Sequence, residues 1–159
     1  MLILASNLSN TPVMSLQTGS QLARTGRAII DPSNLQILAY ELKANTFLNQ
    51  EMLVRIADIR ELSRVGFIVD SGEDFILPND VFKIKEILDL NFNLLDLRVE
   101  DEKKHKIGKI IDYTISLSNF SVQQLIVKRP FMKSFSDPTL TIHRSQIIEI
   151  NDNKIVIQS

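Results

Sequence analysis

The sequence predicts an all-β protein built from two tandem small β-barrels that are joined by a short connector. Three observations lead to this fold class. Short apolar stretches recur at close spacing with turn residues between them, which is typical of small barrels. The periodicity of an amphipathic helix is confined to one segment, at residues 81–88. One strand–turn–strand stretch of the first half also recurs in the second half without a gap.

The recurring stretch runs from Leu22 to Leu42 and returns from Ile107 to Val127. In the first copy, Asp31-Pro32-Ser33-Asn34 separates two apolar runs. Proline presets φ at the first central position of a turn, and Asp, Ser and Asn hydrogen-bond their own backbone there, so a hairpin is predicted. A shift of 85 residues superimposes the two copies and keeps apolar residues on apolar residues. The predicted core positions are Ile30, Ile37, Ile115 and Val122.

The first module is predicted to span residues 11–79. Residues 1–10 before it are predicted to be a frayed leader, the alternative being an edge strand that covers the barrel. Asp58 begins a segment that we interpret either as one helical turn or as the start of a strand. Strands are predicted at 13–16, within the hairpin 22–42, at 52–56 and at 65–69, with turns at 18–20 and 70–74 and a polar loop at 43–51.

Residues 80–91 are predicted to form the connector and residues 92–159 the second module. Within the connector, Val81, Ile84, Ile87 and Leu88 share one face of a predicted short helix, the alternative being an extended segment over a sheet edge. The second module is predicted to begin with a strand at 94–97. A turn four residues longer than its counterpart then follows in the charged run 100–106. Further strands are expected in the hairpin 107–127, at 140–143, within 145–150 and at 155–157.

Size and composition limit the function classes. A chain of 159 residues with 44% hydrophobic residues can bury a core, although each module alone is near the lower size limit for a stable domain. The modules are therefore expected to stabilise each other. The net charge of −1 argues against binding of nucleic acid through the whole surface. The absence of Cys excludes disulfides and thiolate sites and, with no signal peptide or transmembrane run, predicts a cytoplasmic protein.

The first module resembles the PRC-barrel family, which is named after the H subunit of the photosynthetic reaction centre and includes a small-subunit ribosome maturation factor. The family pattern is similar to the opening strand Pro12–Leu16, the Gly19 turn, the strand that ends in Asp31-Pro32, the short Asp58-Ile59 segment and the closing Phe67–Val69 strand. In the second module, Ile107-Gly108-Lys109-Ile110 is similar to a family segment, whereas Ser116-Leu117 replaces Asp-Pro. The resemblance implies partly open six-stranded barrels that act as docking modules and carry no shared catalytic residue.

Catalytic or metal-binding groups are few. His105 lies in a charged run and His143 beside a predicted strand, and neither has further ligands at metal-site spacing, so both are interpreted as surface or structural residues. The adjacent carboxylates Glu73-Asp74 and Asp101-Glu102 are typical of solvated turns rather than of an acid–base pair. We therefore expect a protein that is not an enzyme and uses no cofactor or metal.

The segment from Lys128 to Phe135 is the candidate site. It combines three cations with Phe and Met side chains, which are enriched where proteins dock. The alternatives are that its apolar side chains plug a barrel end, or that Phe stacks on RNA bases while the cations meet phosphate. The predicted function is a protein-interaction adaptor, with a ribosome-assembly or RNA-associated factor as the alternative. The candidate partner-binding residues are Lys128, Arg129, Phe131, Met132, Lys133 and Phe135.

Overall fold

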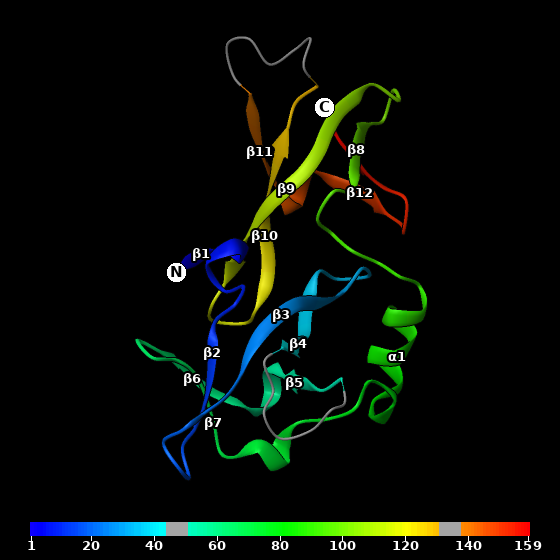
Figure 1. Ribbon diagram of the computed structural model, residues 1–159. Coiled ribbons are helices and arrows are strands. Elements are labelled where there is room, and N and C mark those ends of the chain that lie inside the picture. The colour runs from blue at the N-terminus through cyan, green and yellow to red at the C-terminus, as the bar shows by residue number, and fades with distance from the viewer. Residues whose placement is uncertain (44–50, 131–137) are drawn as a thin grey trace. The chain divides into compact units, whose positions relative to one another are not determined.

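A computed structural model describes residues 1–43, 51–130 and 138–159 of the chain (Figure 1). In these ranges the protein is almost entirely β, with 13 strands and one α-helix. The chain divides into two compact units. The repeat-one unit consists of Asn7–Ile30 and Ile37–Asp89, and the repeat-two unit consists of Met1–Ser6, Asp31–Gln36 and Leu90–Ser159. The all-β class is thus confirmed, while the boundaries 11–79, 80–91 and 92–159 stay a prediction.

The repeat-one unit holds six strands in the order β5-β4-β3-β2-β7-β6. β2 runs parallel to β7, with Val13 opposite Phe67, and the neighbouring β2–β3 and β6–β7 pairs are antiparallel. The strands are β2 (Pro12–Ser15), β3 (Gln21–Asp31), β4 (Gln36–Lys43), β5 (Leu53–Arg55), β6 (Ile59–Ser63) and β7 (Gly66–Val69).

The repeat-two unit repeats this order as β11-β10-β9-β8-β13-β12. β8 runs parallel to β13, with Val99 opposite Ile155, in the place of the β2–β7 pair. Neither β5 with β6 nor β11 with β12 pairs among the described residues, so each sheet is open there. The strands are β8 (Arg98–Asp101), β9 (Lys106–Ser116), β10 (Ser121–Lys128), β11 (Thr139–His143), β12 (Ile147–Ile150) and β13 (Lys154–Ile157).

The predicted duplication of the hairpin is confirmed at the level of the strand bounds. Both ends of β3 and of β4 lie 85 residues before the corresponding ends of β9 and β10. All four predicted core residues are buried, with exposed fractions of 4% for Ile30, 1% for Ile37 and 0% for Ile115 and Val122. Apolar side chains therefore fill equivalent positions of the two units, as alternation along a half-buried strand requires.

The predicted strand at 94–97 is wrong, because these residues form a turn before β8. The amide of Leu97 donates to the Leu94 carbonyl, and Asp96 has a φ of 69°. Leu94 and Leu97 are both buried, so their spacing follows a turn rather than a strand. The strand that corresponds to β2 is β8, which ends at Asp101. The predicted four-residue lengthening of the next turn is consequently also wrong, since four residues connect β8 to β9 and five connect β2 to β3.

The amino terminus is a strand and not a frayed leader. β1 (Leu2–Leu4) pairs antiparallel with the carboxyl-terminal part of β9, with Leu2 opposite Ser116 and Leu4 opposite Thr114. Ser6 then donates from its backbone amide and its hydroxyl to the carboxylate of Asp112, at 3.1 and 2.6 Å. Of the two predicted alternatives, the edge strand is therefore correct for residues 2–4, where β1 pairs with β9 of the sheet.

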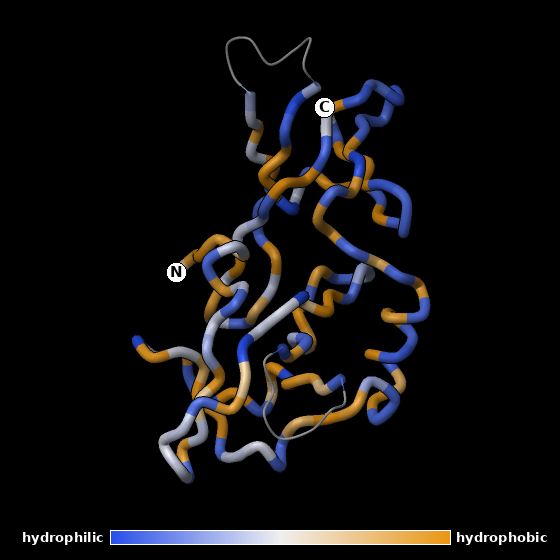
Figure 2. Tube along the Cα trace, viewed as in Figure 1, coloured by the Kyte–Doolittle hydropathy of each residue, from blue (hydrophilic) through white to orange (hydrophobic). Residues whose placement is uncertain are grey.

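The connector contains the predicted helix, here α1 (Phe82–Asp89), whose buried side chains are Ile84 and Ile87. At Asp58 the strand alternative is closer, because β6 begins at the next residue, while the 3-10 turn Ile56–Asp58 ends at Asp58 instead of beginning there. Figure 2 shows apolar residues along the strands of both units and a hydrophilic tip between β8 and β9. In the described part of the chain, no helix has the length and apolarity needed to cross a membrane.

Candidate functional site

The structure describes only the beginning of the predicted docking segment. Lys128 is the last residue of β10 and is exposed, while Arg129 and Pro130 are half-buried. The amide of Arg129 donates to the Pro138 carbonyl at 2.9 Å, which continues the pairing of β10 with β11 for one more residue. Phe131, Met132, Lys133 and Phe135 lie outside the described residues. Both predicted roles for these side chains, as a barrel plug and as a docking surface, stay predictions.

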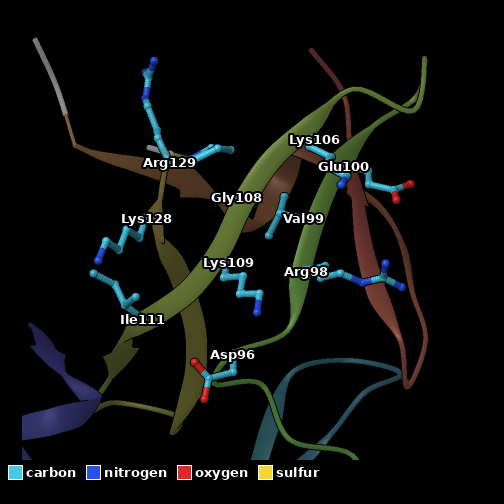
Figure 3. Close-up of a pocket in the computed structure, with 11 residues that line it drawn as sticks. Asp96, Arg98, Val99, Glu100, Lys106, Gly108, Lys109, Ile111, Lys128 and Arg129 are labelled. Atoms are coloured by element: carbon cyan, nitrogen blue, oxygen red, sulfur yellow. The ribbon is translucent and has the colours of Figure 1, made fainter. Parts of the chain in front are cut away.

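Lys128, Arg129 and Pro130 line one side of a hollow of about 480 Å³ in the repeat-two unit (Figure 3). The other sides come from β8 and β9. We call this site the basic hollow, because five of its lining residues are cations and two are acids. The cations are Arg98, Lys106, Lys109, Lys128 and Arg129, and the acids are Asp96 and Glu100.

Strand register places three of these cations in one row across the sheet. Lys109 on β9 lies directly opposite Arg98 on β8 and directly opposite Lys128 on β10. Residues that lie opposite each other in antiparallel strands point to the same face, with Cβ atoms about 4.5–5.5 Å apart. All three are exposed. In Figure 3, Lys109 lies between the other two, whose charged ends extend to either side of it.

The acids of the basic hollow do not neutralise this row. Glu100 pairs with Lys154 of β13, with 3.0 Å between Oε2 and Nζ. Asp96 lies in the turn before β8, below Lys109 in Figure 3, and makes no ion pair with the row. Among the described residues, no carboxylate lies within ion-pair distance of Arg98, Lys109 or Lys128. The row therefore has no ion-pair partner within the described part of the chain, and cations outnumber acids in the lining of the hollow.

A glycine allows β10 to approach β9 at this site. Gly108 has a φ of 153°, and a Cβ built on it would lie 2.1 Å from the carbonyl oxygen of Lys128 and 2.8 Å from a methyl group of Val127. No side chain fits at these distances. The absence of a side chain at Gly108 thus lets the backbone of Lys128 lie against β9. The corresponding position of repeat one is Ala23.

The tip that leads from β8 to the hollow is organised by a buried carboxylate. Asp101 accepts hydrogen bonds from the amides of Lys103 and His105, at 2.9 and 2.8 Å, and its other oxygen lies 2.8 Å from Nδ1 of His105. Burial by itself would raise the pKa of Asp101, but the hydrogen bonds from His105 and Lys103 outweigh it and the pKa is lowered. The ionised carboxylate thus fixes the chain that places Lys106.

The other residues considered in the sequence, His143 and the pair Glu73-Asp74, do not line the hollow. His143 is exposed, and its Nδ1 lies 2.9 Å from the Ser145 hydroxyl at a 3-10 turn. Glu73 and Asp74 lie in the 3-10 turn Gly72–Asp74, which Ser71 caps. In the described ranges, no three His, Asp or Glu side chains lie together as a metal site would require.

Sequence reasoning missed Arg98 and Lys109. These residues are far apart in the chain from Lys128, and only strand pairing brings the three together. A signal was available in the hairpin, because counting outward from its turn at 117–120 brings Lys109 near Lys128. Arg98 carried no such signal, because the strand expected before the hairpin was placed at 94–97 rather than at β8.

Compared with known protein families and with curated proteins, the chain shows no match. The PRC-barrel resemblance therefore stays a prediction that rests on the sequence pattern.

Proposed function

We propose that the chain is a non-catalytic protein-interaction module that binds a partner protein through the basic hollow of the repeat-two unit. The observation that carries the proposal is the row of Arg98, Lys109 and Lys128, which is exposed and has no carboxylate in ion-pair distance among the described residues. Charged groups on a docking face steer a partner of opposite charge and fix its register.

Two further points support a docking role. Ile111, which is 46% exposed, and Pro130 add apolar surface to the same hollow, as in interfaces that combine a polar rim with apolar contacts. The PRC-barrel resemblance also implies docking modules, because family members act in membrane complexes and in ribosome assembly. We also propose that the two units are PRC-type barrels and that the protein is cytoplasmic.

The test compares two variants of the full chain. The row variant carries R98Q, K109Q and K128Q. The control variant carries R64Q, K103Q and K104Q, which remove the same charge from exposed residues outside the hollow. Each protein serves as bait in native lysate, and captured proteins are identified by mass spectrometry and purified for kinetic measurements. We expect the row variant to lose a partner that the wild type and the control variant retain.

Association and dissociation rates of the captured partner then distinguish electrostatic steering by the row from direct contact with it. Loss of rim charges lowers the association rate more than the lifetime of a protein complex. Equal capture by all three baits would show that the basic hollow is not the docking face. RNA binding is the second candidate, since five cations line the hollow. Recovery of RNA alone, with a salt dependence that flattens in the row variant, would replace the protein partner by RNA.

A further inference from the structure

We infer that the occupant of the basic hollow is an acidic segment of a partner protein that lays several carboxylates across β8, β9 and β10. The inference rests on the proposed function and adds the chemical class of the partner. Four observations lead to it: the internal comparison of the two repeats, the like charges placed opposite each other, the spread of the row and the apolar surface beside it.

The two repeats show that the complete row is particular to repeat two. Repeat one has Arg24 in the place of Lys109 and Lys43 in the place of Lys128, but Pro12 in the place of Arg98. Pro12 lies opposite Arg24 in repeat one just as Arg98 lies opposite Lys109 in repeat two. The cation pair of repeat two thus corresponds to a proline–arginine pair in the same strand register. The first residues of β3 and β9, Gln21 and Lys106, differ in the same way. Both repeats nevertheless have the same strand order.

We expect the row to oppose folding instead of assisting it. Like charges directly opposite each other in a sheet are destabilising. Lys109 has such a neighbour on both sides, in Arg98 and Lys128. A negatively charged ligand would screen both repulsions at once. The repulsive free energy removed in this way would add to the affinity of the ligand. Repulsion that persists in the free protein is a common property of sites that are built for binding rather than for stability.

The spread of the row favours an extended ligand over a small anion. Neighbouring strands lie about 4.8 Å apart, so the three Cα atoms span about 10 Å. The charged ends of Arg98 and Lys128 extend away from Lys109 in Figure 3. In this arrangement a single phosphate or carboxylate does not match all three groups at once. A chain with several negative charges fits, since carboxylates at alternate positions of an extended segment are about 6.6–6.8 Å apart.

The remaining lining residues favour protein over RNA. Ile111 offers exposed apolar surface, and Pro130, which follows the row cation Lys128 and Arg129 in the chain, is a further apolar residue of the lining. Asp96 and Glu100, which lie on opposite sides of the row in Figure 3, would repel a phosphate backbone, whereas a protein segment can place uncharged residues there. No aromatic side chain lines the hollow among the described residues, so the stacking platform that single-stranded RNA needs is missing from this part of the surface.

The binding test uses the full chain and three fluorescent probes. The first is a 12-residue peptide of four Glu-Glu-Leu units, the second is the same peptide with Gln in place of Glu, and the third is a 12-nucleotide oligouridylate. We expect the acidic peptide to bind wild type and control variant alike, and its affinity for the row variant to fall by about tenfold or more. The Gln peptide should bind none of the proteins, and shifted backbone amide resonances should map to β8, β9 and β10.

A single substitution separates a binding role from a structural one. K109Q removes both like-charge pairs of the row. We therefore expect this variant to keep or raise the melting temperature at low salt and to bind the acidic peptide with lower affinity than the wild type. The rise should disappear at 1 M salt, where the Debye length is about 3 Å. A structural role for Lys109 predicts the opposite, a lower melting temperature with unchanged peptide binding.

The outcomes distinguish this inference from the proposed function. Equal affinity of the acidic peptide for the row and control variants, no binding of that peptide by the wild type, or tighter binding of oligouridylate that is lost in the row variant would overturn the inference. If the bait experiment still recovers a protein that needs the row, the proposed function stands and its partner class is wrong. If neither the peptide nor any captured protein depends on the row, both fail.

Discussion

Asp101 stabilises the tip between β8 and β9 and thereby positions one side of the basic hollow. Its carboxylate has an exposed fraction of 5% and accepts from two backbone amides while it contacts the His105 ring. The corresponding residue of repeat one, Ser15, uses its hydroxyl to accept from the amide of Thr18 at 3.2 Å. In both repeats a side chain at the end of the strand accepts a hydrogen bond from a backbone amide of the following turn. Only repeat two uses a charged acceptor.

The pKa of Asp101 leads to a pH prediction. Because its folded-state pKa lies below the ordinary value of 3.8, the ionised form stabilises the fold above that pH, and the contribution is lost as pH falls through the folded pKa. We expect D101N to lower the melting temperature at pH 7, and the gap to the wild type to narrow below pH 3.8. Thermal melts from pH 7 to pH 3 measure this.

D152N serves as the control for this series, because Asp152 is exposed and has no hydrogen bond to another described residue. It should leave the melting temperature unchanged across the range. A D101N gap that stays constant down to pH 3 would show that the carboxylate contributes through its shape and not through its charge.

At the scale of elements, the hairpin β9–β10 depends on Gly108. An alanine at this position would place its Cβ against the backbone of Lys128, and backbone atoms cannot move aside as the end of a side chain can. We expect G108A to destabilise the protein by roughly 1–3 kcal/mol, the range of overpacking substitutions. Hydrogen exchange should show the loss of protection in β10 and β9, and denaturant unfolding gives the free energy.

Gly26 in β3 provides the matched control. Its nearest neighbour is the Glu41 carbonyl oxygen at 3.3 Å from a built Cβ, which a small shift can relieve. G26A should therefore change the free energy of unfolding by less than G108A does. Equal effects of the two substitutions would mean that the close approach at Lys128 is not what limits residue 108.

At the scale of the whole molecule, sequence halves and structural units do not coincide. The repeat-two unit includes β1 and the turn Asp31–Gln36, both of which come from the first half of the chain. In that turn, the Leu35 carbonyl accepts from the Val122 amide at 2.9 Å, and the Asn34 carbonyl accepts from the Arg144 guanidinium at 2.8 Å. A fragment of the second half alone therefore lacks two segments that its unit uses.

We accordingly expect the fragments 1–79 and 80–159 to melt at lower temperatures than the full chain, or to be unfolded. Each is also near the lower size limit of stable domains. Mixing the fragments should restore part of the missing stability of 80–159, because fragment 1–79 supplies β1 and the turn. Thermal melts of each fragment, the mixture and the full chain measure this. Fragments that each melt at the full-length temperature would contradict the expectation.

The sequence by itself determined the β class, the duplication and the hairpin core. Alternation and turn residues are local signals, so Ile30, Ile37, Ile115 and Val122 were correctly placed before any contact was known. Helical periodicity likewise located α1 within one residue at each end. The turn at 94–97 was misassigned because Leu94 and Leu97 are buried in a turn, where burial does not follow the period of a strand.

Only the tertiary structure decided where the cations meet. Lys109 is opposite Arg98 and Lys128 because of strand register, and a register shifted by one residue would send every side chain of a strand to the other face. The order of strands, including the parallel β8–β13 pair, depends on non-local pairing that no local pattern encodes. Composition records 18 cations and 19 acids, close to neutral overall, while the fold gathers three of these cations into one uncompensated row.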